Sequence, residues 1–196
     1  MVFNMRQNTT RLRANARALA FVPEALCLAG GGLQTQGRVI APFRYNAPMS
    51  QLHLEDFAVG QRFTSGTRAI TADEIKSFAA SFDPQPFHTD EAAAQDSFFQ
   101  GLAASGWHTA AITMSLLVKS GMPIAGGLIG AGAEIAWPKP VRPGDVLQVE
   151  SEVLAVTPSR SRPERGMITV RTVTTNQKGE PVQVLTSRML VWRRPT

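Results

Sequence analysis

The segment Asp83-Pro-Gln-Pro-Phe-His88 begins with an aspartate and ends with a histidine. Both residue types can exchange protons near neutral pH when their surroundings adjust the pKa. Each proline disfavours helical geometry at the residue before it, so we expect a stiff loop. A stiff loop can hold a carboxylate and an imidazole facing one small volume, where the two groups could act on the same water. The same spacing also occurs in ordinary turn caps and surface polar contacts, so spacing alone leaves both interpretations open.

Length and composition indicate one domain, or one domain with a tail. The chain has 196 residues, of which 43% are hydrophobic, which is enough for a sizeable core. No apolar run is long enough to span a bilayer, so we expect no membrane partner. The single cysteine, Cys27, excludes an intrachain disulfide framework and fits a reducing compartment. We therefore expect a cytoplasmic location.

The net charge of +5 comes entirely from the N-terminal part of the chain. Residues 1–48 hold six arginines, no lysine and one acid, Glu24. Residues 49–196 hold fourteen basic and fourteen acidic residues. The body is therefore neutral and predicts no basic face for a nucleic acid.

Residues 1–48 show no sustained helical or strand period and contain a run of three glycines. Arg-rich, acid-poor composition resembles an organelle transit peptide. Upstream sequence included by a wrong start site and a flexible basic arm are the other interpretations. We favour a disordered or non-native extension followed by a folded domain at 49–196.

The body begins with a strand predicted over 63–70 and three predicted helices. Thr71 and Glu74 form a capping box, so a helix is expected over 72–82. A short helix over 91–96 and a long helix over 106–119 should follow. The long helix presents a broad apolar face, which we expect to be deeply buried; its members are Trp107, Ala110, Ala111, Met114, Leu117 and Val118.

Four strands are predicted to follow, over 128–137, 146–156, 167–175 and 182–193. Residues 176–179 form the hairpin turn between the last two. This order predicts an α+β fold, with the four strands in an antiparallel meander packed against one central helix. A sheet wrapped on one helix leaves an exposed edge, which commonly pairs in a dimer.

Three spaced motifs carry a resemblance to a known family. Residues 83–94 resemble the hydratase signature of the MaoC-like dehydratases, the (R)-specific enoyl-CoA hydratases. Residues 101–109 look like that family's helix-start motif, and residues 141–145 are similar to its recurrent turn before a strand. The similarity covers roughly residues 53–193. It implies a hotdog fold, in which an antiparallel sheet wraps around one long central α-helix, and a homodimer or higher homo-oligomer.

The resemblance also implies an activity and its residues. It implies a hydro-lyase of fatty acid metabolism that adds water to, or removes it from, an enoyl or 3-hydroxyacyl thioester of coenzyme A or of an acyl carrier protein. Asp83 and His88 would be the general acid–base pair. Gly106, which opens the long helix, would donate its backbone N–H to the thioester oxygen, although it also fits a packing glycine. The reaction needs no metal and no redox cofactor.

This sequence departs from the family pattern around Gly106. A histidine often precedes this glycine in the family, whereas Ser105 does so here. Ser105, Trp107 and His108 are candidate substrate contacts, and His108 fits an interior histidine equally well. Some members carry a serine further along the helix that contacts the catalytic loop. Met114 stands at that position in this chain.

Three arginines cluster in the segment 158–166, at Arg160, Arg162 and Arg165. A solvated loop between two strands is one interpretation. The other is a clamp for the phosphates of coenzyme A or for an acidic carrier protein.

Other functional classes fit the sequence less well. Asp83, His88, Asp90 and His108 could be metal ligands, but prolines separate the first two and no paired histidine motif is present. Ser105 near His108 could suggest a nucleophilic serine, but the sequence has neither a Gly-x-Ser-x-Gly elbow nor a suitable strand before it. A hotdog acyl-CoA thioesterase usually relies on an acid on the central helix, and residues 106–119 contain none. A non-catalytic acyl-thioester binding module is the remaining alternative.

Overall fold

The computed structural model describes residues 51–195. The predicted N-terminal extension, residues 1–48, lies outside the described residues. Among the described residues, no helix combines the length and apolar content needed to cross a membrane.

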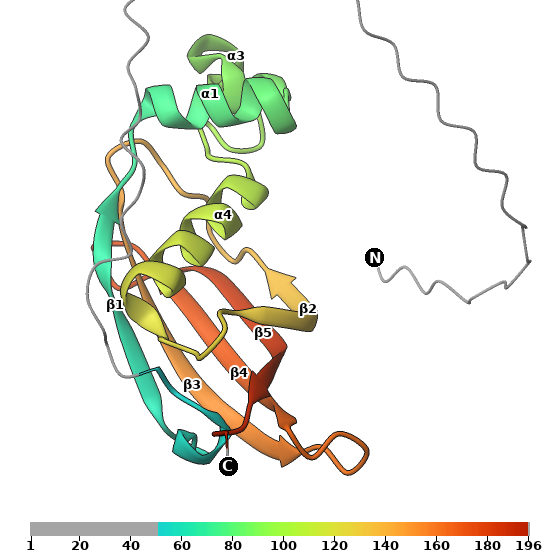
Figure 1. The fold of residues 1–196 in the computed structure, drawn as a ribbon. Helices are drawn as coiled ribbons and strands as arrows, with labels where there is room; N and C mark the ends of the chain where they lie inside the picture. The colour runs from blue at the N-terminus through green and yellow to red at the C-terminus, as the bar shows by residue number, and fades with distance from the viewer. Residues whose placement is uncertain (1–50, 196) are drawn as a thin grey trace, which may run out of the picture. The chain divides into compact units, whose positions relative to one another are not determined.

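One five-stranded antiparallel sheet forms the body, in the order β1-β3-β4-β5-β2 (Figure 1). Its strands are β1 (Arg62–Ala69), β2 (Ile129–Ala136), β3 (Val146–Pro158), β4 (Arg165–Thr175) and β5 (Pro181–Trp192). All five lie close to their predicted positions. The predicted meander is correct for β3, β4 and β5 but wrong for β2, which pairs with β5 at the other edge. The connection over 137–145 contains three prolines, which oppose a tight hairpin between β2 and β3.

Helix α4 (Gly106–Leu116) lies against one face of this sheet and ends in a π-helical turn, Leu117–Gly121. An antiparallel sheet wrapped around one central helix is the hotdog arrangement, which confirms the predicted fold class. The predicted apolar face is buried only in part: Leu117, in the π-helical turn, is buried, whereas Trp107 is 61% exposed and Met114 is 47% exposed. The opposite face packs on the sheet, through His108, Thr109, Ile112, Thr113 and Leu116.

The buried face of α4 is misjudged from the sequence because it carries polar side chains. Thr113 shares a hydrogen bond of 2.7 Å with Thr174 on β4, so its hydroxyl is satisfied inside the core. A hydropathy pattern places threonine outside and methionine inside. The apolar outer face, exposed in a single chain, is therefore available to a partner.

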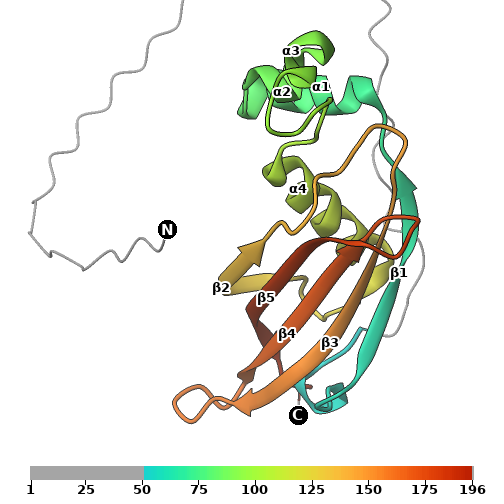
Figure 2. The ribbon, with the colours of Figure 1, turned by 180° about the vertical axis from the view of Figure 1, so that it is seen from behind.

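Three further helices gather at one end of the sheet, above the start of α4 (Figure 2). They are α1 (Ala72–Phe82), α2 (Pro86–Thr89) and α3 (Glu91–Gln95), and a 3₁₀ turn, Leu54–Asp56, precedes β1. Helix α1 has its predicted bounds, and its capping box is present: Glu74 N donates to Thr71 Oγ1 over 3.2 Å. The loop predicted over 83–88 is partly wrong, since Pro86 opens α2. Proline fits the first helical position, where its missing N–H would have no partner.

Candidate active site

Asp83 caps the C-terminal end of α1, where its backbone N–H donates to Ala79 O over 2.9 Å. Its carboxylate accepts two hydrogen bonds of 2.7 Å. Ser105 Oγ donates to Oδ2, and Gln85 Nε2 donates to Oδ1. The side chain is 17% exposed, so the acid is fixed in position but still reached by solvent.

The His88 imidazole is buried, and its contacts show that Nδ1 carries a hydrogen. Nδ1 lies 2.7 Å from Ala103 O. A carbonyl oxygen only accepts, so Nδ1 carries a hydrogen and donates it. In the neutral ring, Nε2 then has a free lone pair, and it lies 3.5 Å from Asp83 Oδ2. This separation is long for a direct hydrogen bond, which favours a water bound by both groups.

The surroundings of Asp83 favour its charged form. The hydrogen bond from Ser105 is the main cause that lowers the pKa of Asp83 below its ordinary value, assisted by Gln85 and by the nearby His88, while partial burial opposes them. Asp83 is therefore ionised at neutral pH. When the imidazole is in its neutral form, the Asp83 carboxylate and the His88 Nε2 lone pair present two acceptors to one water, which can donate one O–H to each.

Ser105 has a role that the sequence did not predict. Rather than facing substrate, it is fully buried and donates to Asp83, and its Oγ also accepts from Trp107 N over 3.2 Å at the start of α4. Met114 replaces the serine that some family members carry further along the helix, and in this chain Ser105 is the serine that contacts the catalytic loop. Ser105 is 22 positions from Asp83, so only the folded chain shows the pairing.

A cleft of about 340 Å³ opens beside His88, and Asp83 is not among the residues that line it. Its lining comprises His88, Phe98, Phe99, Ala104, Gly106, Thr109 and the segment 137–141. Gly106 opens α4, and helix geometry leaves its N–H without an intrahelical partner. His88 and Gly106 therefore border one cleft, and Gly106 stands at the positive end of the helix dipole.

Arg142 holds in place the segment that leads to Ala103. The Arg142 guanidinium donates to Gly101 O over 2.6 Å and to Leu102 O over 3.1 Å, and it also donates to Phe99 O. These bonds fix the segment that orients His88 and forms one wall of the cleft. The arginine lies in the motif at residues 141–145, but the sequence did not reveal this function.

The other predicted contacts are placed differently. Trp107 is exposed and meets Trp137 edge-on, with ring centroids 5.5 Å apart. His108 is buried and stacks on Phe78 with ring centroids 4.5 Å apart, and its Nδ1 has no hydrogen-bond partner. His108 is not part of the cleft lining.

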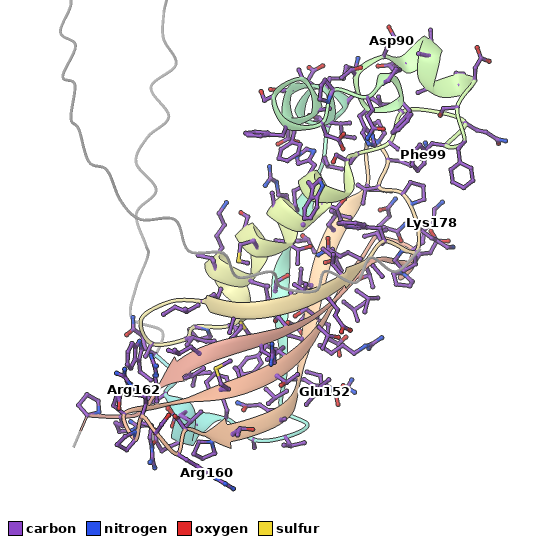
Figure 3. The ribbon with its side chains drawn as sticks, turned by 90° about the vertical axis from the view of Figure 1, so that its right-hand side faces the viewer. Asp90, Phe99, Glu152, Arg160, Arg162 and Lys178 are labelled. Atoms are coloured by element: carbon purple, nitrogen blue, oxygen red, sulfur yellow. The ribbon has the colours of Figure 1, made fainter. Side chains whose placement is uncertain are left out.

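The arginine cluster is not brought to the site within one chain. Arg160 and Arg162 lie at the end of the sheet opposite Asp90 and Phe99 (Figure 3). Arg165 begins β4 at that same distant end. A role for these arginines at the cleft would require a second subunit.

Within residues 51–195, no cluster of three or more His, Cys, Asp or Glu side chains is arranged to hold a metal ion. Asp90, weighed above as a ligand, instead caps α3 by accepting from Ala93 N over 2.8 Å.

The hotdog sheet and helix, with an acid and an imidazole held at the start of the helix, define the class of protein. The family model described as "MaoC like domain" matches residues 56–177, so this chain belongs to the MaoC-like domain family. This confirms the resemblance noted in the sequence.

Known relatives agree with this placement. A crystal structure of a MaoC-like dehydratase from Rhodospirillum rubrum is 61% identical, with a TM-score of 0.73, over 74% of this chain and 99% of that one. The unliganded (R)-hydratase PhaJ1 from Pseudomonas aeruginosa is 27% identical, with a TM-score of 0.59, over 74% and 88%. The uncharacterized protein YdeM of Bacillus subtilis is 39% identical over 65% of this chain and 89% of its own length.

Ser105→Ala should weaken both activity and stability. We expect about a tenfold loss of turnover, because Asp83 loses a positioning hydrogen bond. Ionised Asp83 stabilises the fold above its ordinary pKa of 3.8, and this contribution is lost as pH falls through its lowered folded pKa. The variant should therefore lose more unfolding free energy at about pH 7 than at about pH 3, as measured by urea denaturation. An equal loss at both pH values would contradict the assigned contact.

His108→Leu should flatten the pH dependence of stability. Burial is the main cause that lowers the pKa of His108, and Arg68 adds to it, although Glu74 opposes them. Stability from the neutral ring is present above the ordinary pKa of 6.5 and is lost as pH falls through the lowered value. Between about pH 7.5 and about pH 5, the melting temperature should fall less in the variant than in the wild type. Parallel curves would refute this, and His53→Leu is the matched control.

Proposed function

We propose that this protein is a hydro-lyase that adds water to an enoyl thioester, or removes it from a 3-hydroxyacyl thioester, with a coenzyme A ester as substrate. The observation that carries the proposal is that His88 and Gly106 line one cleft, while the Asp83 carboxylate lies 3.5 Å from the His88 imidazole. The similarity to PhaJ1 and to the (R)-hydratase from A. caviae involved in PHA biosynthesis, which is 28% identical, supports this reaction class.

In the proposed reaction, one water lies beside the two facing atoms, Asp83 Oδ2 and His88 Nε2, in contact with both. The carboxylate and the Nε2 lone pair each accept one of its O–H bonds, which directs an oxygen lone pair at the β-carbon. As the C–O bond forms, one member of the pair takes a proton from the water. The pair then returns a proton to the α-carbon on the same face, so syn addition is expected.

Negative charge develops on the thioester oxygen during this attack. The Gly106 N–H and the start of α4 would stabilise it, since backbone donors and the helix dipole favour an anion there. In the reverse direction the same groups remove the α-proton and protonate the departing hydroxyl. The chemistry uses side chains and backbone alone, so we propose that no cofactor takes part, and cellular concentrations set the direction.

A hotdog thioesterase is the runner-up, and it is disfavoured because α4 and its π-helical turn contain no Asp or Glu. One assay separates the candidates. The purified protein is given crotonyl-CoA and a panel of longer and branched enoyl-CoAs, while loss of the conjugated absorbance and release of free thiol are followed together. Hydration without thiol release supports the proposal. Thiol release indicates a thioesterase, and binding with neither signal indicates a binding module.

We further propose a homodimer or higher homo-oligomer that covers the outer face of α4. Trp107, Met114 and Val118 form an exposed apolar stripe on that face, and Ile129 on the edge strand β2 is also exposed. Free edge strands favour pairing with a second copy. A cytoplasmic location stays a prediction that rests on the lone Cys27.

Met114→Glu should dissociate the oligomer. A carboxylate placed in an apolar interface loses its hydration without gaining a partner, so we expect a shift to monomer at micromolar concentration. Light scattering coupled to size-exclusion chromatography measures the mass. Leu154→Glu is the matched control, because Leu154 is 42% exposed and Met114 47%, and Leu154 lies on β3 away from the stripe. An unchanged mass in Met114→Glu would count against this interface.

A further inference from the structure

The connection that follows β2 places the indole of Trp137 directly against Gly106. A Cβ added to Gly106 would lie 2.7 Å from Cε2 and 2.8 Å from Cδ2 of this ring. Only glycine tolerates such an approach. Trp137, Gly106 and His88 line the same cleft, so the indole is a wall of that cleft beside the Gly106 N–H.

A chain of buried hydrogen bonds holds the indole in this orientation. Trp137 Nε1 donates to Gln183 Oε1 over 3.0 Å, and Gln183 Nε2 donates to Thr113 Oγ1 over 3.1 Å. Thr113 and Thr174 are joined by a further bond of 2.7 Å. Gln183, Thr113 and Thr174 are each at most 1% exposed. Rotation of the indole would leave Gln183 Oε1 unsatisfied in the core, which is costly, so the wall is rigid.

We propose that Trp137 sets the specificity of the cleft at the α-carbon of the acyl group, disfavouring thioesters with a substituent there. Gln183 is a positioning residue that acts through Trp137. This inference rests on the proposed function, in which a thioester oxygen lies at Gly106.

The geometry explains why the α-carbon is the discriminating atom. An oxygen that accepts from the Gly106 N–H lies about 3 Å from that nitrogen and therefore beside the indole. The α-carbon is bonded to the same carbonyl carbon, so a branch on it must lie close to the wall. Carbons further along the chain can turn away. A fixed wall thus rejects an α-branch by steric clash while it accepts a straight chain.

Binding of two isomeric saturated thioesters tests this without requiring turnover. Butyryl-CoA and isobutyryl-CoA have the same atoms and differ in whether the fourth acyl carbon extends the chain or branches from the α-carbon, and calorimetry gives Kd for each. The wild type should prefer butyryl-CoA, and Trp137→Ala should reduce that preference by about tenfold, the effect expected when a hydrophobic site gains room for one carbon. Trp137→Phe, which keeps a ring but loses the N–H, should reduce it by less.

Gln183→Met should also reduce the preference for butyryl-CoA, as Trp137→Phe does. Methionine leaves the indole present but removes the oxygen that accepts its N–H. Gln148→Met is the matched control. Gln148 is a glutamine on β3 that donates to Ser65 O over 3.1 Å and lies outside the cleft lining, so its variant should keep the wild-type preference. Melting temperatures show whether each variant is folded. If Gln183→Met does not fold, the variants of the partly exposed Trp137 supply the test alone.

The outcomes separate this inference from the proposed function. An unchanged preference in Trp137→Ala overturns the inference, and hydration of crotonyl-CoA by the wild type would leave the proposed function standing. A reduced preference in a protein that hydrates no thioester supports the wall but removes the proposed activity. Failure of the wild type to bind either ester overturns the inference, and the hydration assay with crotonyl-CoA then decides the proposed function separately.

Discussion

Asp83→Asn is expected to lower kcat for crotonyl-CoA hydration by about 10²-fold or more, with little change in KM. Asparagine keeps the size of the side chain and can still accept from Ser105, but its neutral amide takes up no proton. A loss confined to kcat indicates an interaction made in the transition state. Steady-state kinetics on the purified variant measures both constants.

Asp90→Asn is the matched control for this substitution. Asp90 belongs to the same motif and caps α3, and asparagine caps helices as well as aspartate does. This variant should keep wild-type kinetics. If Asp83→Asn also turned over at the wild-type rate, Asp83 would have no part in proton transfer.

His88→Gln is expected to lose about 10²-fold or more of kcat as well. The glutamine amide can still donate to Ala103 O, so the local fold should persist, but it offers no lone pair that takes a proton near neutral pH. The kinetics should be measured together with the melting temperature. His53→Gln, at a histidine outside the cleft lining, is the control. An active His88→Gln would assign the proton transfers to Asp83 alone.

Local signals account for the parts of the fold that the sequence predicts well. The capping box at Thr71 and Glu74 marks the start of α1, and Asp83-Pro84 marks its end, so the helix has its predicted bounds. The same local reasoning missed α2, because Pro86 was interpreted as a helix breaker although proline also opens helices.

Non-local packing accounts for the errors. Which face of α4 is buried depends on whether Thr113 finds a partner on β4, 61 positions away. The edge position of β2 depends on its pairing with β5, about 50 residues later, as in Ile135 with Leu185. A periodicity contains neither kind of information.

The candidate site divides in the same way. Asp83 and His88 are five positions apart, so their proximity follows from the motif. Ser105, Trp137 and Gln183 join the site only through the fold. Ser105 was predicted only as a candidate substrate contact, and nothing in the sequence connected it with Asp83, 22 positions away.

The central claim is that Asp83 and His88 act as one unit on one water. Residual crotonyl-CoA hydration by the double variant Asp83→Asn/His88→Gln, compared with each single variant and the wild type, tests it most directly. Residues that act as a unit are strongly non-additive, so the double variant should be about as slow as the slower single variant. Losses that multiply would show two independent roles, and wild-type rates in the double variant would contradict the mechanism altogether.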